Sequence, residues 1–207
     1  NIPPGSGIGA NFRGKAPAAQ IYSLKLHETL GSGFGFDPYN QQQIAATNAL
    51  ISNNSWGYEQ DNDYDLAAAS YDAAVRDSLP FIEGMQQICY VFAAGNDGGG
   101  DDGGFGGREG SIVSPATGKN VITVGALEQM RNITNDVVID GFTNSIWKGG
   151  TDSSADVAAY SSRGNVGVNV EGDNGRFKPD LVAPGSWVVS ARSGQFDEGE
   201  FYSTTNI

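Results

Sequence analysis

A single carboxamide follows the most apolar stretch of the sequence. Residues 88–94 read I-C-Y-V-F-A-A, and Gly95 and Asn96 follow directly. Ligands of α/β proteins bind at the carboxyl ends of parallel strands, and a side-chain NH2 placed there can donate a hydrogen bond to a developing oxyanion. The same residues also fit an Asn-Asp-Gly turn that only closes a strand, and this segment alone does not separate the two interpretations.

Three aspartates, Asp97, Asp101 and Asp102, lie in the glycine-rich stretch 97–110. Calcium binds carboxylate and backbone oxygens, so this stretch is a candidate calcium loop, although it lacks the EF-hand spacing. A solvated surface loop accounts for the same composition. We expect no required cofactor, with structural calcium at the three aspartates as the alternative.

The sequence contains one histidine, His27, and one cysteine, Cys89. One histidine cannot build a zinc site of several imidazoles, and as a general base it would need a nucleophile that its neighbours do not suggest. Cys89 lies in an apolar stretch, so we expect a buried core residue and no internal disulfide.

Charge and hydropathy exclude some partners. The net charge of −12, from 24 acidic and 12 basic residues, would repel a polyanion, so we expect no nucleic-acid partner. No apolar run approaches the roughly 18 residues of a membrane span, so we expect no membrane partner. The start N-I-P-P-G has no signal-peptide features.

Residues 5–10, G-S-G-I-G-A, fit a dinucleotide-binding fingerprint. That motif requires a preceding strand and a following helix, whereas two prolines precede it here and N-F-R-G follows. We therefore interpret it as a loop. A nucleotide-binding α/β domain is the weaker rival hypothesis, and a lack of stabilisation by NAD would dismiss it.

Strand-like and helix-like stretches alternate along the chain. Periodicity predicts helices over 37–50 and 65–78, the second with Asp65 as its N-cap. β-prone runs predict strands at 21–26, 88–94, 121–124, 181–183 and 187–189, and residues 51–56 are interpreted as a further short strand. This alternation predicts an α/β fold, specifically a three-layer α/β/α sandwich with a mostly parallel sheet. We expect residues 1–207 to form a single domain, since no linker or repeat interrupts them.

Six motifs, in one order, resemble those of subtilisin-like serine peptidases, the subtilases. They are G-K-A-P-A-A-Q-I-Y-S-L-K at 14–25, N-S-W-G at 54–57, A-A-G-N at 93–96, S-P-A with V-I-T-V-G-A at 114–126, S-S-R-G at 161–164, and K-P-D-L-V-A-P-G at 178–185. Each motif alone is weak, whereas the ordered set is specific. The resemblance implies a secreted serine endopeptidase that cleaves extended polypeptide substrates through an acyl-enzyme.

The resemblance also implies roles for matched residues. Asn96 would be the side-chain donor of the oxyanion hole. The segment 55–57 would pair with extended substrate as an added strand, and the specificity pocket would be lined from 93–95 and from Val113. The implied substrate-binding residues are Ser55, Trp56, Gly57, Ala93, Ala94, Gly95 and Val113. The Ser114–Pro115 bond falls where subtilases carry a cis peptide, so we predict cis here.

The sequence departs from the family at the catalytic triad. The D-[ST]-G, H-G-T-H and G-T-S-[MA]-A motifs are not among these 207 residues, and His27 follows the G-x-A-P motif instead of preceding it. We expect a segment between the catalytic His and Ser, inactive by itself because it has no nucleophile or base. The rival hypothesis is a pseudopeptidase, a binding or structural module. Triad motifs in flanking sequence would favour the enzyme.

Overall fold

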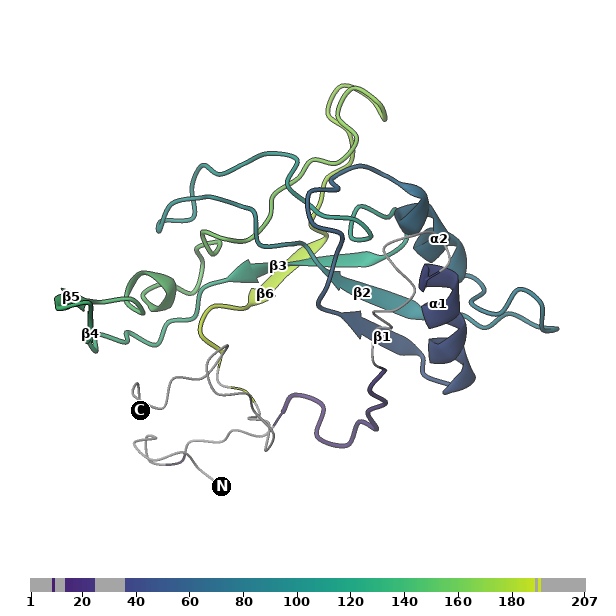
Figure 1. Ribbon diagram of the computed structural model, residues 1–207, viewed down its shortest axis with the longest axis horizontal. Coiled ribbons are helices and arrows are strands. Elements are labelled where there is room, and N and C mark those ends of the chain that lie inside the picture. Colours follow the sequence, from purple (N-terminus) through teal and green to yellow (C-terminus); the bar gives the residue numbers. More distant parts are fainter. Residues whose placement is uncertain (1–8, 10–13, 25–35, 189, 191–207) are drawn as a thin grey trace. The chain divides into compact units, whose positions relative to one another are not determined.

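The structure is a computed structural model that describes residues 9, 14–24, 36–188 and 190 (Figure 1). The chain divides into two compact units, one of residues 1–23 with 189–207 and one of residues 24–188. All described helices and strands lie in the second unit. The expectation of a single domain over 1–207 stays a prediction.

Four parallel strands form the central sheet of the second unit. Their order is β1-β2-β3-β6, with bounds Ile51–Asn54, Cys89–Ala93, Ile122–Leu127 and Leu181–Pro184. The register aligns Asn54 with Phe92 and Ala93 with Val124. All carboxyl ends therefore meet at one edge, on the left of the sheet in Figure 1. This arrangement confirms the α/β class and the mostly parallel sheet.

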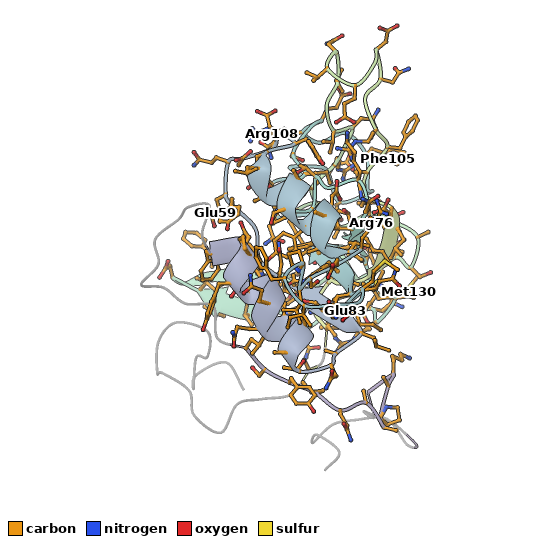
Figure 2. The ribbon with its side chains drawn as sticks, turned by 90° about the vertical axis from the view of Figure 1, so that its right-hand side faces the viewer. Glu59, Arg76, Glu83, Phe105, Arg108 and Met130 are labelled. Carbon is orange, nitrogen blue, oxygen red and sulfur yellow. The ribbon has the colours of Figure 1, made fainter. Side chains whose placement is uncertain are left out.

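Helices α1 (Phe36–Ala46) and α2 (Leu66–Ala74) lie side by side over one face of the sheet (Figures 1 and 2). The Tyr71 ring of α2 packs edge-on against Tyr90 and Phe92 of β2, with centroid distances of 5.0 and 4.9 Å. All three side chains are at most 1% exposed. Such pairs add about 0.5–1.5 kcal/mol each beyond area burial, so the core lies between the helices and this face. No described helix is long and apolar enough to span a bilayer.

Side chains on the opposite face of the sheet are only partly covered. Burial alternates with period two along β2, so that Tyr90 and Phe92 are buried while Cys89 and Val91 are half-buried. The prediction of a buried Cys89 is therefore wrong. Cys89 does lie in an apolar strand, as predicted, but its side chain points away from the helices.

Several predicted elements differ from the structure. The helix expected over 65–78 ends at Ala74, and the strand expected over 51–56 ends at Asn54. The helix expected over 37–50 ends at Ala46, and Asn48 adopts a left-handed conformation with φ 58° that cannot continue it. The described residues 21–24 form no strand, and Ile21 is 88% exposed. Residues 187–188 form none either, because Trp187 has φ 49°, which no strand accommodates.

A buried lysine fixes β6 beside β3. The Lys178 ammonium donates to the carbonyl oxygen of Val121 at 3.0 Å and to Asp180 Oδ2 at 2.6 Å. The same Asp180 oxygen accepts from the Thr123 backbone N–H at 2.7 Å. The K-P-D motif therefore satisfies polar groups at the start of both strands. Between these strands the chain makes a long excursion that contains the hairpin of β4 (Val137–Ile139) and β5 (Phe142–Asn144) and the short helix η2 (Gly149–Thr151).

Asp65 caps α2, as predicted, and also ties it to a loop at the sheet edge. Its Oδ1 accepts from the Ala68 N–H at 2.8 Å and from the Ser114 hydroxyl at 2.5 Å. We expect Asp65→Ala to lower the free energy of unfolding by about 1–2 kcal/mol, because a first-turn N–H loses its acceptor. Urea unfolding measures this. The control is Asp63→Ala, an exposed aspartate outside the cap; equal effects of both changes would contradict the cap.

Candidate active site

The chain leaves the sheet after β2 through a residue that is bonded on both sides. The Ala94 N–H donates to the carbonyl of Val124 at 2.9 Å, and the Ala94 carbonyl accepts from the Val113 N–H at 3.1 Å. Ala94 is 1% exposed. It therefore extends the sheet by one residue and places the next residues, Gly95 and Asn96, beyond the edge.

Gly95 makes the turn that brings Asn96 to the surface. Its φ is 113°, and a Cβ added there would lie 2.7 Å from Ser162 Oγ and 3.2 Å from Val113 Cγ2. The Ser162 N–H donates to the Gly95 carbonyl at 3.0 Å, and Ser162 Oγ accepts from the Asp97 N–H at 3.1 Å. Ser162 thus holds both sides of the turn, and the carboxamide of Asn96 between them is exposed.

Ser162 has a positioning role that the sequence analysis did not assign. The S-S-R-G motif pointed to the segment, but only the fold shows that its second serine contacts residues 65 or more positions earlier. Its neighbour Ser161 accepts from the Ala126 N–H at 2.9 Å, which ties the same segment to β3. In the sequence, the signal for this role is the pair of hydroxyls in the S-S-R-G motif.

Val113 brings two of the predicted substrate-binding segments together. A Cβ on Gly57 would lie 2.6 Å from Val113 Cγ2 and 3.0 Å from the Ser114 carbonyl oxygen. That carbonyl accepts from the Tyr58 N–H at 2.7 Å. Since Val113 also contacts Gly95, the structure gathers Gly57, Gly95 and Val113 around one side chain that is 7% exposed.

Trp56 contributes its side chain to the core and not to this edge. Its ring lies edge-on to Tyr58, Tyr71 and Phe92 at 5.7, 6.1 and 5.5 Å. Its Nε1 donates to Asn54 Oδ1 at 3.2 Å. The neighbouring Ser55 is exposed. The backbone of 55–57, which is all that strand addition requires, remains at the carboxyl end of β1.

A buried acid fixes the residue next to Gly57. Both oxygens of Asp37 accept from the Tyr58 hydroxyl, at 3.0 and 3.1 Å, and Asp37 is 3% exposed. Burial raises the pKa of Asp37, and burial followed by the Asp37 charge raises the pKa of Tyr58. The tyrosine therefore stays a protonated donor at neutral pH. This bond links α1 to the segment that carries Gly57.

A guanidinium lies within the Gly/Asp loop 97–110. Arg163 Nη1 donates to the Gly104 carbonyl at 3.0 Å. A Cβ on Gly100 would lie 2.1 Å from Arg163 Nη2, and one on Gly107 would lie 2.6 Å from its Nε. The two glycines leave room for the guanidinium, and Gly107 also adopts φ 97° and would place a Cβ 2.8 Å from the Gly98 carbonyl oxygen. The loop 97–110 therefore surrounds the positively charged guanidinium of Arg163.

The three predicted calcium ligands serve different contacts. The Asp97 N–H binds Ser162, and Asp101 Oδ1 accepts from the Phe105 N–H at 2.7 Å. Asp102 packs against Gly149, where an added Cβ would lie 2.1 Å from its Oδ1. In the part of the chain that the structure describes, no three His, Cys, Asp or Glu residues form a metal-binding group. Calcium at these aspartates stays a prediction.

Two further predictions concern single positions. The Ser114–Pro115 bond is cis, as predicted. His27, which we did not take as the family histidine, lies outside the described residues.

Comparison with known proteins identifies the family. Residues 4–205 match the model of the Subtilase family, and the chain belongs to this family of serine peptidases. It is 27% identical over 206 residues to the serine protease AprX of Bacillus subtilis (strain 168), covering 91% of this chain and 36% of that protein. The chain thus spans about a third of the curated relative's length.

Two solved structures are also similar. Sphericase is 25% identical with a TM-score of 0.45, and the match covers 82% of this chain and 44% of that one. The S41 psychrophilic protease is 22% identical with a TM-score of 0.40, over 75% of this chain and 40% of that one.

The contact between Gly57 and Val113 is testable by a double-mutant cycle. We expect Gly57→Ala to lower the free energy of unfolding by about 1–3 kcal/mol, because the new methyl overlaps Val113 Cγ2. Val113→Ala removes that atom, so the double variant should lose less than the sum of the single losses, by about 0.5–3 kcal/mol. Urea unfolding of all four proteins measures the coupling.

Gly14→Ala is the control, since a Cβ there meets no atom within 4 Å. Strictly additive effects of Gly57→Ala and Val113→Ala would show that the two segments do not touch in solution.

Proposed function

We propose that the full-length protein containing this chain is a secreted endopeptidase that hydrolyses extended polypeptides through an acyl-enzyme. The observation that carries the proposal is the position of Asn96. It follows a buried parallel strand, on an exposed turn that Ser162 holds at both sides. Membership of a serine peptidase family supports the same chemistry.

In this proposal the chain supplies the oxyanion hole and much of the substrate groove. The Asn96 NH2 donates to the oxygen that becomes negative when the nucleophile adds to the scissile carbonyl. An extended peptide pairs with the backbone of 55–57 and places one side chain against the groove wall formed from 93–95 and Val113. The Gly57–Val113 and Gly95–Ser162 contacts fix the spacing of these groups before substrate arrives.

The nucleophile and the base come from outside these residues in this proposal. The triad motifs are not in the 207-residue sequence, so the segment alone has no group to form or resolve an acyl-enzyme. The acidic charge of −12 fits a protein that works on polypeptides outside the cell and binds neither nucleic acid nor a membrane surface.

Replacement of Asn96 tests the oxyanion role. We expect Asn96→Ala in the full-length protein to lower kcat about 10²- to 10³-fold on a peptide substrate, because the lost donor acts in the transition state. KM should change little, since ground-state binding uses other groups. Steady-state kinetics measure both constants.

The matched control is Asn174→Ala, an exposed asparagine far along the chain from the turn. It should leave kcat and KM unchanged. An Asn96→Ala variant with full kcat would refute the role, and a full-length protein without peptidase activity would refute the proposed function.

We further propose that the protein requires no cofactor at the loop 97–110. The Arg163 guanidinium contacts three glycines of this loop, so a calcium ion there would face a fixed positive charge. We expect EDTA to leave the melting temperature of the protein unchanged. A decrease that CaCl2 reverses, and that Asp101→Asn abolishes, would instead establish calcium at the predicted aspartates.

A further inference from the structure

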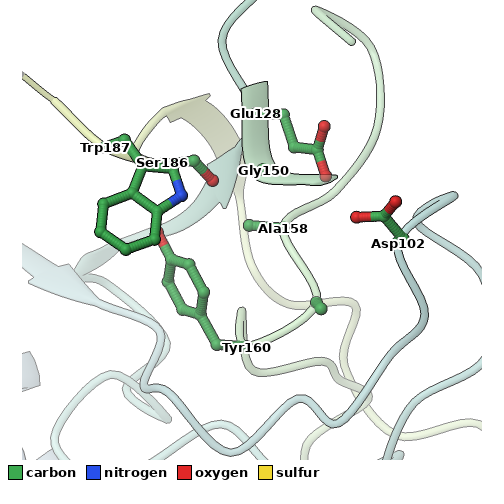
Figure 3. Close-up of a pocket in the computed structure, with 8 residues that line it drawn as sticks. Asp102, Glu128, Gly150, Ala158, Tyr160, Ser186 and Trp187 are labelled. Atoms are coloured by element: carbon green, nitrogen blue, oxygen red, sulfur yellow. The ribbon is translucent and has the colours of Figure 1, made fainter. Parts of the chain in front are cut away.

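A cavity is lined by residues 158–160, which precede the serine that holds the Asn96 turn. Its volume is about 350 Å³, and small residues between 150 and 159 form part of its wall. Two carboxylates, Asp102 and Glu128, and two aromatic rings, Tyr160 and Trp187, complete it (Figure 3). The proposed peptidase chemistry assigns no role to these four side chains.

Glu128 is a buried acid with one carboxylate oxygen that lacks a partner among the described residues. It directly follows β3 and is 2% exposed, yet its Oε2 forms no hydrogen bond with the described residues. It takes part in none of the ion pairs found in that part of the chain. A buried carboxylate oxygen without a partner destabilises the fold, so its retention at a cavity wall indicates a ligand that compensates the charge.

The charges around Glu128 are of the same sign. Burial raises the pKa of Glu128, and Asp102, Asp152 and Asp156 raise it further in that order, while a hydrogen bond with the Ser153 backbone lowers it. In Figure 3 the carboxylates of Glu128 and Asp102 point toward one another across the cavity. A cation between them would be attracted by both.

The aromatic wall is fixed before any ligand binds. The Trp187 ring lies edge-on to Trp147, with centroids 6.3 Å apart, and a Cβ on Gly150 would lie 2.9 Å from Trp187 Nε1. The Arg131 guanidinium donates to the Trp187 carbonyl oxygen. These contacts hold the left-handed Trp187 in place, so the ring offers a rigid face to a ligand.

The cavity shares structural elements with the candidate active site. The Tyr160 carbonyl accepts from the Gly98 N–H at 2.9 Å, and the Ala159 carbonyl accepts from the Gly100 N–H at 2.8 Å. Two residues further along, Ser162 binds the Asn96 turn. The cavity wall and the turn are therefore two parts of one pair of hydrogen-bonded segments.

We infer that this cavity binds the basic side chain, Lys or Arg, of a peptide. Its apolar and aromatic walls suit the aliphatic stem of such a residue. Its two carboxylates and its indole ring suit the cationic head. Calcium would need six to eight oxygen ligands, whereas no group of three acidic, His or Cys ligands exists among the described residues. The identification of this peptide as a substrate rests on the proposed function.

Binding of small probes tests the cavity without any catalysis. Isothermal titration of the full-length protein would compare N-acetyl-arginine amide and N-acetyl-lysine amide with the neutral N-acetyl-norleucine amide. We expect the two basic amides to bind at least about tenfold more tightly, since a charged hydrogen bond to a buried acid is lost with the neutral probe.

Two variants locate the binding. Glu128→Gln should weaken binding of the arginine amide at least about tenfold. Asp102→Asn, a change at an exposed position, should weaken binding in the same direction. Glu83→Gln changes the same charge at an exposed position after α2 (Figure 2) and should have no effect. Circular dichroism checks that all three variants fold.

The pH dependence of affinity supplies a readout that a purely structural role would not alter. Since the pKa of Glu128 is raised, the acid is neutral at low pH and ionises as pH rises through that value. Affinity for the arginine amide should therefore increase with pH over this range. This dependence should disappear in Glu128→Gln.

Three results would overturn the inference, and a fourth would refute only the proposed function. Equal binding of the norleucine amide, or unchanged affinity in Glu128→Gln, would exclude a cation site at Glu128. Competition by CaCl2 with a full loss of arginine-amide binding would assign the cavity to a metal. A protein that binds the arginine amide but hydrolyses no peptide would refute the proposed peptidase function and leave the cavity assignment standing.

Discussion

Burial of one face of β2 beneath α2 is the constraint on which the rest of the structure depends. Tyr90 and Phe92 must both face Tyr71, and with a period of two this also points Ala94 inward. The strand therefore ends with a small buried residue bonded to its neighbours. The turn at Gly95 then begins at a fixed place on the sheet edge.

The positions of the segments at that edge depend on contacts so close that only glycine fits at two of them. Gly57 and Gly95 both meet Val113, and Gly95 also meets Ser162. A larger side chain at either position would push apart segments that come from three different parts of the chain. Interiors are packed too densely to absorb such a change. Packing therefore fixes the spacing between the backbone of 55–57 and the Asn96 carboxamide, and it does so before any ligand binds.

Local chemistry explains what the sequence predicted well. Asp65 was identified as an N-cap because its side chain bonds within its own helix turn, and the strand at 89–93 is a continuous apolar run. The strand at 51–54 buries Ser52 and Asn54 and exposes Ile51, so hydropathy alone does not predict it. The errors concern residues governed by distant contacts. Cys89 faces away from the helices, and Trp187 is left-handed. Ser162 and Arg163 act on a loop about 60 positions earlier, which no local pattern reveals.

Two arginines near the Asn96 turn and the cavity are both bound to backbone carbonyl groups. Arg163 is committed to the Gly104 carbonyl and to the close approach of Gly100 and Gly107, so its charge is held inside the loop. Arg131 is directed to the Trp187 carbonyl. Neither cation forms an ion pair with Glu128, even though the protein carries a net charge of −12. The field near the cavity therefore stays negative, and it would draw a basic segment of a polypeptide toward the same edge that presents Asn96.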